Sequence, residues 1–236
     1  MTAPEALLFD VFGTCVDWRG SMAREGEALG QRLGIADVDW VAVAEAWRGQ
    51  YQPQMETVRS RQRPWVTLDT LHREGLDAVL AQFGLDDIPA VERETFTNGW
   101  RCLDPWPDVG PGLRRLRGRY LLAPNSNGNI ALMVRLARWA NLPWDTILGA
   151  EIAHAYKPQP AVYLRSVEAL GLAPAQVMMV AAHSNDLDAA AACGLQTAFV
   201  PRPLEFGPGH SSPRVPERTF DLAAVDFEDL ARQLGC

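Results

Sequence analysis

The sequence predicts an α/β fold in which a doubly wound, mainly parallel sheet carries an all-helical cap inserted after the first strand. Short apolar runs that end at turn residues recur along the chain with helical patterns between them, and this alternation is typical of a Rossmann-like sheet with right-handed crossovers. One long stretch breaks the alternation, because residues 18–100 show helical periodicity and no strand pattern. We therefore expect an α/β core of residues 1–16 and 104–236 and a helical cap of residues 17–103.

The first strand is predicted at Ala6–Phe9, an apolar run that ends at Asp10 and is followed by Gly13 and Thr14. A short apolar run closed by a glycine turn is typical of a strand that is buried on both faces of a parallel sheet. The insert that follows carries apolar residues at helical spacing, and Pro53 is expected to kink the helix that contains it.

The chain is expected to return to the sheet through a stiff hinge at Asp104–Asp108, where prolines alternate with other residues. Strand and helix patterns then alternate again. The predicted strands are Tyr120–Ala123, Thr146–Leu148, Val177–Ala182 and Thr197–Val200, and the predicted helices are Gly112–Leu116, Ile130–Trp139, Ala161–Leu170 and Leu187–Cys193. The tail Pro201–Pro216 is rich in Pro and Gly and is expected to be a loop.

The composition of the 236-residue chain is that of a globular protein, with 47% hydrophobic and 22% charged residues. Its net charge of −7 argues against a nucleic-acid partner, because binding to the phosphate backbone needs a basic surface. There is no apolar run of about 18 residues and no basic leader, so we expect a cytoplasmic protein that does not enter a membrane. The four cysteines are scattered without C-x-x-C spacing, which is typical of reduced thiols.

Polar residues follow the predicted strands at the point where each strand ends; they are Asp10, Ser126-Asn127, Lys157 and Asp186. Ligands of open α/β sheets bind beyond the carboxyl ends of the strands, so we expect these side chains to meet in one crevice. The Lys157 ammonium would keep the Asp10 carboxylate ionised even where water is excluded. An ionised, partly desolvated carboxylate is a nucleophile, so the pattern predicts covalent catalysis at Asp10.

These positions resemble the four motifs of the haloacid dehalogenase superfamily. The segment Asp10-Val-Phe-Gly-Thr14 resembles the first motif, Ser126-Asn127-Gly128 the second, Lys157-Pro158 the third, and Val180–Gly194 with Asp186 the fourth. Order, spacing and strand context agree over essentially the whole chain. Thr14 is either a turn residue that donates to the backbone or a residue that holds Asp10.

Two positions within this resemblance separate phosphatases from dehalogenases. Phosphatase members carry an acid two residues after the nucleophile, where this chain has Phe12, and a magnesium-binding acid where it has Ala182. Neither side chain can protonate a leaving alkoxide or bind Mg²⁺, whereas a halide leaves as a stable anion without such help. These absences favour dehalogenation, with no metal and no cofactor.

The chain also resembles the type II 2-haloacid dehalogenases. Trp47-Arg48-Gly49-Gln50-Tyr51 is similar to the cap segment from which that family sends an arginine over the site, which implies that Arg48 binds the halide. The segment from Lys157 to Tyr163 matches the family's Lys-Pro-x-Pro-x-x-Tyr spacing, which implies that Tyr163 orients the lysine or the nucleophile. The further residues that the resemblance implies at the substrate are Val11, Phe12 and Trp47, with Ser126 and Asn127 holding the substrate carboxylate.

The fourth motif departs from the family pattern. Counting back from Asp186, the Ser-x-Asn-x-x-Asp form is replaced by Ala181 and His183, and Ser184-Asn185 is displaced by one residue. This Ala-Ala-His variant resembles a sub-branch with members that attack the C–F bond. It implies that His183 lines the pocket, and it leaves open which groups position the hydrolytic water.

The resemblance implies hydrolysis of short 2-haloalkanoic acids (haloacetates and L-2-haloacids) to 2-hydroxy acids, through an ester on Asp10 and with inversion at C2. Water activated by Asp186, with His183 as a second candidate, would hydrolyse the ester. Similar enzymes are commonly homodimers. Two alternatives stay open at this point: a small-molecule phosphatase of the same superfamily with unusual metal ligation, and a binding member that has lost catalysis.

Overall fold

The computed structural model describes residues 3–210, 216 and 218–236, and its main sheet confirms the α/β fold class. The strand order is β5–β4–β1–β6–β7–β8, and each pair of neighbouring strands is parallel. The strands are β1 (Ala6–Phe9), β4 (Leu121–Ser126), β5 (Leu148–Gly149), β6 (Val177–Ala181), β7 (Gln196–Phe199) and β8 (Leu222–Ala223). Since β4 and β6 flank β1 in the middle of the sheet, the carboxyl ends of these three parallel strands lie side by side at one edge of it.

Helices pack on both faces of this sheet. They are α5 (Val109–Leu116), α6 (Ile130–Trp139), α7 (Ala150–Ala153), α8 (Pro160–Ala169), α9 (Ser184–Ala192) and α10 (Phe227–Gln233), with a 3₁₀ turn η2 (Pro174–Gln176). Side chains alternate along β1, so Leu7 and Phe9 belong to one buried cluster and Ala6 and Leu8 to the other. The continuous apolar run of β1 is therefore explained by burial on both faces.

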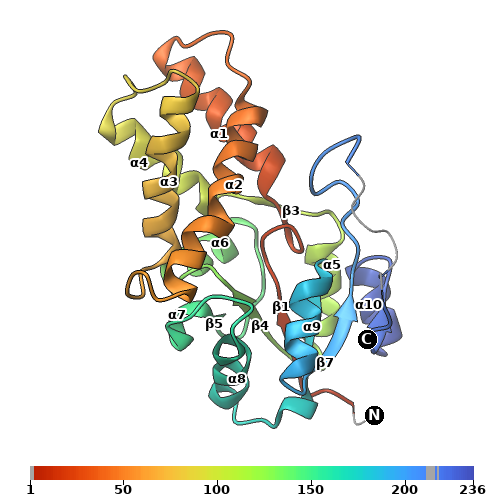
Figure 1. Cartoon of the computed structure of the whole chain (residues 1–236). Coiled ribbons are helices and arrows are strands. Elements are labelled where there is room, and N and C mark those ends of the chain that lie inside the picture. The colour runs from red at the N-terminus through yellow and green to blue at the C-terminus, as the bar shows by residue number, and fades with distance from the viewer. Residues whose placement is uncertain (1–2, 211–215, 217) are drawn as a thin grey trace.

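We call the helices between the first two core strands the cap: α1 (Trp18–Leu33), α2 (Trp40–Arg59), α3 (Leu68–Gln82), α4 (Ala90–Asn98) and the 3₁₀ turn η1 (Gly99–Arg101). They lie together at the far side of the molecule from the two termini (Figure 1). An antiparallel pair, β2 (Val16–Asp17) and β3 (Asp104–Pro105), joins the cap to the core. The hinge predicted at Asp104–Asp108 is thus partly a strand. The domain boundary at 17–103 stays a prediction.

Several element ends differ from the predicted ones. Strand β4 runs on to Ser126 instead of ending at Ala123, and β5 shares only Leu148 with the predicted strand. Helix α9 begins at Ser184, so Asp186 lies in its first turn. Helix α2 continues through Pro53 to Arg59, so this proline does not end the helix.

The sequence patterns predict neither β8 nor α10. A strand of 2 residues and a helix of 7 residues are too short to show a clear hydrophobic period. Within the described part of the chain, no helix combines the length and the apolar character that a membrane crossing would require.

Candidate active site

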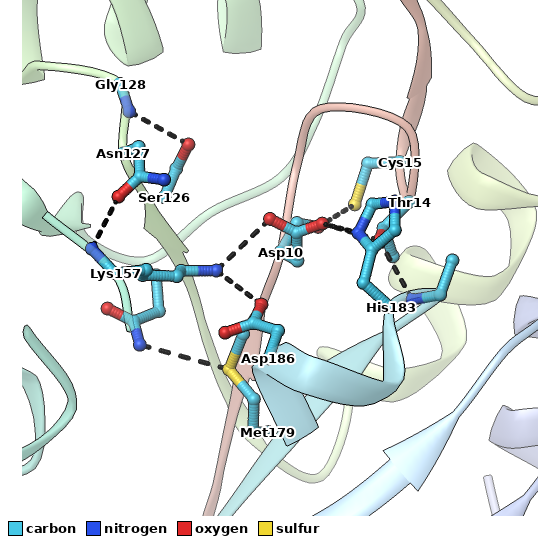
Figure 2. Close-up of polar contacts among 12 residues, drawn as sticks. Asp10, Thr14, Cys15, Ser126, Asn127, Gly128, Lys157, Met179, His183 and Asp186 are labelled. Atoms are coloured by element: carbon cyan, nitrogen blue, oxygen red, sulfur yellow. Dashed lines mark hydrogen bonds and ion pairs between the residues drawn. The ribbon is translucent and has the colours of Figure 1, made fainter. Parts of the chain in front are cut away.

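Asp10 lies at the end of β1, where its backbone N–H donates to the Val180 carbonyl of β6 at 3.0 Å. The two carboxylate oxygens face different groups (Figure 2): Oδ1 accepts from Lys157 Nζ at 3.1 Å, and Oδ2 accepts from Thr14 Oγ1 at 2.7 Å. Burial opposes ionisation, but the Lys157 ammonium and the hydrogen-bond donors on Oδ2 outweigh it and hold the pKa of Asp10 well below its usual value. The carboxylate is therefore ionised at neutral pH.

Lys157 lies between two carboxylates, because its Nζ also donates to Asp186 Oδ2 at 2.6 Å. Burial alone would lower the pKa of Lys157, yet the charges of Asp10 and Asp186 raise it above its usual value. Tyr163 Oη donates to the other Asp186 oxygen at 2.5 Å. The structure thus corrects one expectation: Tyr163 orients Asp186, and through it the lysine, and it makes no direct hydrogen bond to Lys157 or Asp10. Burial raises the pKa of Asp186.

His183 precedes α9 and connects Asp10 to a residue that the motifs do not include. Its Nδ1 lies 3.0 Å from Asp10 Oδ2, and its Nε2 lies 2.8 Å from Glu205 Oε2. Glu205 is buried in the loop that follows β7. Burial opposes a charged imidazole, but the Glu205 and Asp10 carboxylates outweigh it and raise the pKa of His183 to about 10. His183 is therefore an imidazolium at neutral pH.

Ser126 is the last residue of β4 and Asn127 follows it, and the side chains of both bind protein groups. Ser126 is fully buried, its Oγ accepts from the Gly128 N–H at 3.0 Å, and its side chain is not part of the cavity wall that the described residues form. Asn127 lines the cavity; its Oδ1 accepts from the Lys157 N–H at 2.8 Å and its Nδ2 donates to Tyr51 Oη at 3.0 Å. Ser126 thus shapes the turn that carries Asn127, and its O–H is still able to donate because Oγ only accepts in this bond. The contact between the Ser126 side chain and a substrate stays a prediction.

A cavity of about 530 Å³ lies over Asp10, between the core and helix α2 of the cap. The Arg48 guanidinium lies 3.9 Å above the centre of the Tyr51 ring, and its Nη1 is buried without a hydrogen-bond partner among the described residues. Phe12 also lines the cavity. Val11 and Trp47 do not line it, contrary to expectation: Trp47 is 1% exposed and donates its indole N–H to a cap carbonyl, so it packs in the cap interior.

The residues around Asp10 do not fit a magnesium ion. Both carboxylate oxygens already accept hydrogen bonds, and the Lys157 ammonium lies against Oδ1, where it would repel a second cation. Ala182 offers no oxygen ligand from its side chain. Among the residues that the structure describes, no group of three or more His, Cys, Asp and Glu side chains could hold a metal ion.

Sequence reasoning missed Glu205, and it overlooked one feature of Lys157. Glu205 is the single acid in the Pro- and Gly-rich segment 201–216, and nothing periodic or local distinguishes it there. Lys157, in contrast, is the only lysine in the chain, all other basic side chains being arginine or histidine. A compact ammonium fits between two carboxylates where a planar guanidinium would not, so this bias in composition was a usable signal.

Comparison with known proteins gives the following similarities. The family model of the haloacid dehalogenase-like hydrolases matches residues 4–194. Two solved L-2-haloacid dehalogenase structures are similar to this chain. A defluorinating one is 45% identical with a TM-score of 0.96, and the match covers 99% of this chain and 96% of that one. Another is 46% identical with a TM-score of 0.93, and the match covers 98% of this chain and 100% of that one. The (S)-2-haloacid dehalogenase 4A of Burkholderia cepacia is 26% identical over 211 residues, which are 86% of this chain and 87% of that protein.

Proposed function

This chain belongs to the haloacid dehalogenase-like hydrolases, and we propose that it hydrolyses the carbon–halogen bond of short 2-haloalkanoic acids to give 2-hydroxy acids. The similar proteins named above are 2-haloacid dehalogenases. Haloacetates and L-2-haloacids are the substrate class, and the substrate is a small molecule that the cavity of about 530 Å³ can hold.

The observation that carries the proposal is the surroundings of Asp10. Its Oδ1 contacts the Lys157 ammonium at 3.1 Å, a partner that favours the ionised carboxylate, and the residue two positions further on is the apolar Phe12. A charged oxygen beside an apolar wall and shielded from bulk water is a strong nucleophile toward carbon. Phe12 stands at the position where the phosphatases of this superfamily carry their acid.

In the first step the Asp10 carboxylate attacks C2 of the substrate in line with the carbon–halogen bond. The new C–O bond forms an ester, and the halide leaves with the bonding electron pair. Arg48 receives the halide, because its buried Nη1 has no hydrogen-bond partner among the described residues and a guanidinium is weakly hydrated. A single displacement inverts C2, so an L-2-halo acid gives a D-2-hydroxy acid.

In the second step water attacks Cγ of Asp10 and Asp186 accepts its proton. Burial raises the pKa of Asp186, which makes this carboxylate a better base than an exposed one. The Cγ–O ester bond then breaks, the departing oxygen takes the proton, and the hydroxy acid leaves. The Asp10 carboxylate reappears with one oxygen from water, and the overall reaction releases one halide and one proton.

The substrate carboxylate lies between Phe12, in the loop that follows Asp10, and the turn that begins at Asn127. Ser126 contributes by holding that turn through its hydrogen bond to Gly128. The proposal includes fluoroacetate as a substrate. It is supported by a defluorinating L-2-haloacid dehalogenase that is 45% identical in a match covering 99% of the present chain.

The test is a halide-release screen with fluoro-, chloro- and bromoacetate, with and without EDTA. We expect halide release that EDTA does not reduce. Phosphate release from a simple monoester that EDTA blocks, together with no halide release, would replace the proposal by the phosphatase alternative.

A single turnover in ¹⁸O-labelled water then tests the covalent step. We expect the label in Asp10, measured by mass spectrometry of the peptide that contains it. Label that enters the hydroxy acid directly would mean that water, and not Asp10, attacks C2.

A further inference from the structure

The two oxygens of Asp10 differ in how many donors they face. Oδ1 accepts from Lys157 Nζ alone, whereas Oδ2 accepts from Thr14 Oγ1 at 2.7 Å and lies 3.0 Å from His183 Nδ1 (Figure 2). A carboxylate oxygen has two lone pairs in the carboxylate plane, so Oδ2 is saturated and Oδ1 keeps one pair free. Oδ1 is therefore the oxygen that can attack a substrate.

This asymmetry has a consequence for the second step of the proposed function, on which the inference rests. Once Oδ1 carries the substrate carbon, Oδ2 is the carbonyl oxygen of the ester. When water adds to Cγ, the electron pair of that carbonyl moves onto Oδ2, which becomes negative. Thr14 and His183 lie within the 2.7–3.1 Å range at which donors stabilise such an oxyanion.

Glu205 holds His183 from the opposite side. Its Oε2 lies 2.8 Å from His183 Nε2, and its Oε1 accepts from Trp18 Nε1 at 3.2 Å, so both oxygens have partners. The carboxylate packs against Gly13 of the loop that follows Asp10: a Cβ at position 13 would lie 2.0 Å from Glu205 Oε1. Glu205 thus occupies a space that only glycine leaves open, and its side chain is 2% exposed.

The position of Glu205 in the chain makes it independent of the motifs. It lies in the loop after β7, beyond residues 4–194 that the family model matches. In Figure 1 this loop, drawn in blue, rises from the core toward the base of α1. The loop also contributes Phe206, whose ring packs edge-on against Trp18 at 6.0 Å between centroids.

The charges around His183 change during the reaction. At rest, the imidazole faces the Asp10 and Glu205 carboxylates directly. The other charged or titratable groups on the cavity wall are Glu45, Arg48, Tyr51, Arg59, Lys157, Tyr163, Asp186 and His210. Esterification removes the charge of Asp10. Glu205 is then the one carboxylate that still contacts the imidazole among the described residues, so it alone keeps His183 cationic while the ester is hydrolysed.

We propose that His183 binds Oδ2 of Asp10 as a cationic oxyanion donor during ester hydrolysis, with Thr14 as the second donor, and that Glu205 is the positioning residue that keeps His183 charged and oriented. His183 moves no proton in this step. Water gives its proton to Asp186, and the electron pair on Oδ2 re-forms the carbonyl as the Cγ–Oδ1 bond breaks. Oδ1 leaves with the substrate carbon and takes the proton from Asp186, which makes it the hydroxyl of the product.

The test separates the two steps by rapid quench, with chloroacetate as the substrate. Glu205→Gln keeps the shape of the side chain and removes its charge. We expect a halide burst of normal size, with a rate within about threefold of the unaltered enzyme, and ester breakdown that is about 10- to 100-fold slower. The aspartyl ester should accumulate as an added mass on the Asp10 peptide. His183→Leu should show the same pattern with a larger loss.

The matched control is Asp188→Asn, which removes a carboxylate from the same region, at the surface of α9, where Asp188 pairs with Arg218. It should leave both steps unchanged, and circular dichroism should show that all variants fold. Equal slowing of the halide burst and of ester breakdown by Glu205→Gln, without an accumulated ester, would overturn the inference and leave Glu205 a structural residue.

The pH dependence of ester breakdown decides between an oxyanion donor and a base. A cationic donor predicts a rate that falls as His183 loses its proton at high pH, and Glu205→Gln should move this fall to lower pH. If His183 were the base, the rate would rise with pH and Glu205→Gln would move the rise to lower pH, which would overturn the inference. No halide release by the unaltered enzyme would overturn the proposed function itself, a result distinct from both.

Discussion

The two walls of the cavity are built in opposite ways. On the core wall, Asp10, Lys157 and Asp186 each have their polar atoms engaged by charged or hydrogen-bonded partners between 2.5 and 3.1 Å away. On the cap wall, Arg48 lies on the Tyr51 ring with a buried nitrogen that has no partner among the described residues. The core wall is thus a hydrogen-bonded network, whereas the cap wall is an aromatic surface that carries one cation with an unsatisfied hydrogen-bond donor.

The difference indicates a division of labour. A buried donor without a partner lowers the stability of the protein by roughly 1–3 kcal/mol, so a bound anion that accepts from this donor stabilises the cap wall. A complete network instead holds its groups in one geometry before the substrate binds, which is what electrostatic catalysis requires. The core wall therefore suits the bond-making groups, and the cap wall suits the departing halide.

The largest effect should come from Asp10→Asn, which removes the nucleophile from the complete wall. We expect halide release to fall by at least about 10⁴-fold, because the amide cannot form the ester. Halide electrodes or ion chromatography measure this, and circular dichroism should be unchanged. Substantial remaining activity would assign the attack to water and break the proposed contrast between the walls.

Lys157→Met should have the next largest effect, about 10²- to 10³-fold on the halide burst. It leaves Asp10 and Asp186 without their shared cation, so the pKa of Asp10 rises and its burst falls at mildly acidic pH. Lys157→Arg is the informative control. It keeps the charge, and it should still be slow because a planar guanidinium does not fit the position of the ammonium.

Arg48→Lys tests the cap wall, with an expected loss of about 10- to 100-fold in kcat/KM. Inhibition by added chloride or bromide should weaken in parallel, since the halide site is altered. The matched control is Arg32→Lys at the surface of α1, where Arg32 pairs with Glu92 at 3.0 Å. Unchanged halide inhibition in Arg48→Lys would move the halide site away from the cap wall.

The smallest expected effect is that of pH on the first-turnover halide burst. The pKa of Asp10 is held well below its usual value, so its carboxylate stays ionised as the pH falls. Burial lowers the pKa of His72 in the cap, so that imidazole stays neutral over the same pH range. We expect a flat burst from about pH 5 to 9. Ester breakdown should fall first in acid, because burial raises the pKa of Asp186. A burst that fell before ester breakdown did would contradict the assignment.

Much of the site could be predicted because its parts are local in the sequence. Asp10 with Gly13 and Thr14, and Lys157 before Pro158, each combine a strand end with a turn, and parallel strands bring their carboxyl ends to one edge. Tyr163 could be placed near the site from the sequence, but its hydrogen-bond partner, Asp186, could not be predicted. A spacing of six residues does not say which of two neighbouring acids a phenol will reach.

The helices of the cap could be predicted from the sequence, but the cap residues that face the cavity could not. Periodicity places Trp47 and Arg48 on one helix, α2, and it cannot decide which of two adjacent residues faces the core. Packing decided it: Trp47 lies 5.5 Å from the Trp100 ring in the cap interior, and Arg48 turns to the cavity.

The sequence by itself determined the α/β class, the inserted helices and the set of residues at the strand ends, because these depend on hydrophobic period and on turns between near neighbours. Only the tertiary structure decided that Glu205 meets His183, that Ser126 supports a turn, and that Oδ1 and Oδ2 of Asp10 are unequal. The physical reason is distance along the chain. Hydrogen bonds such as that between Trp18 and Glu205 join residues 187 positions apart, and their formation depends on the packing of the whole fold.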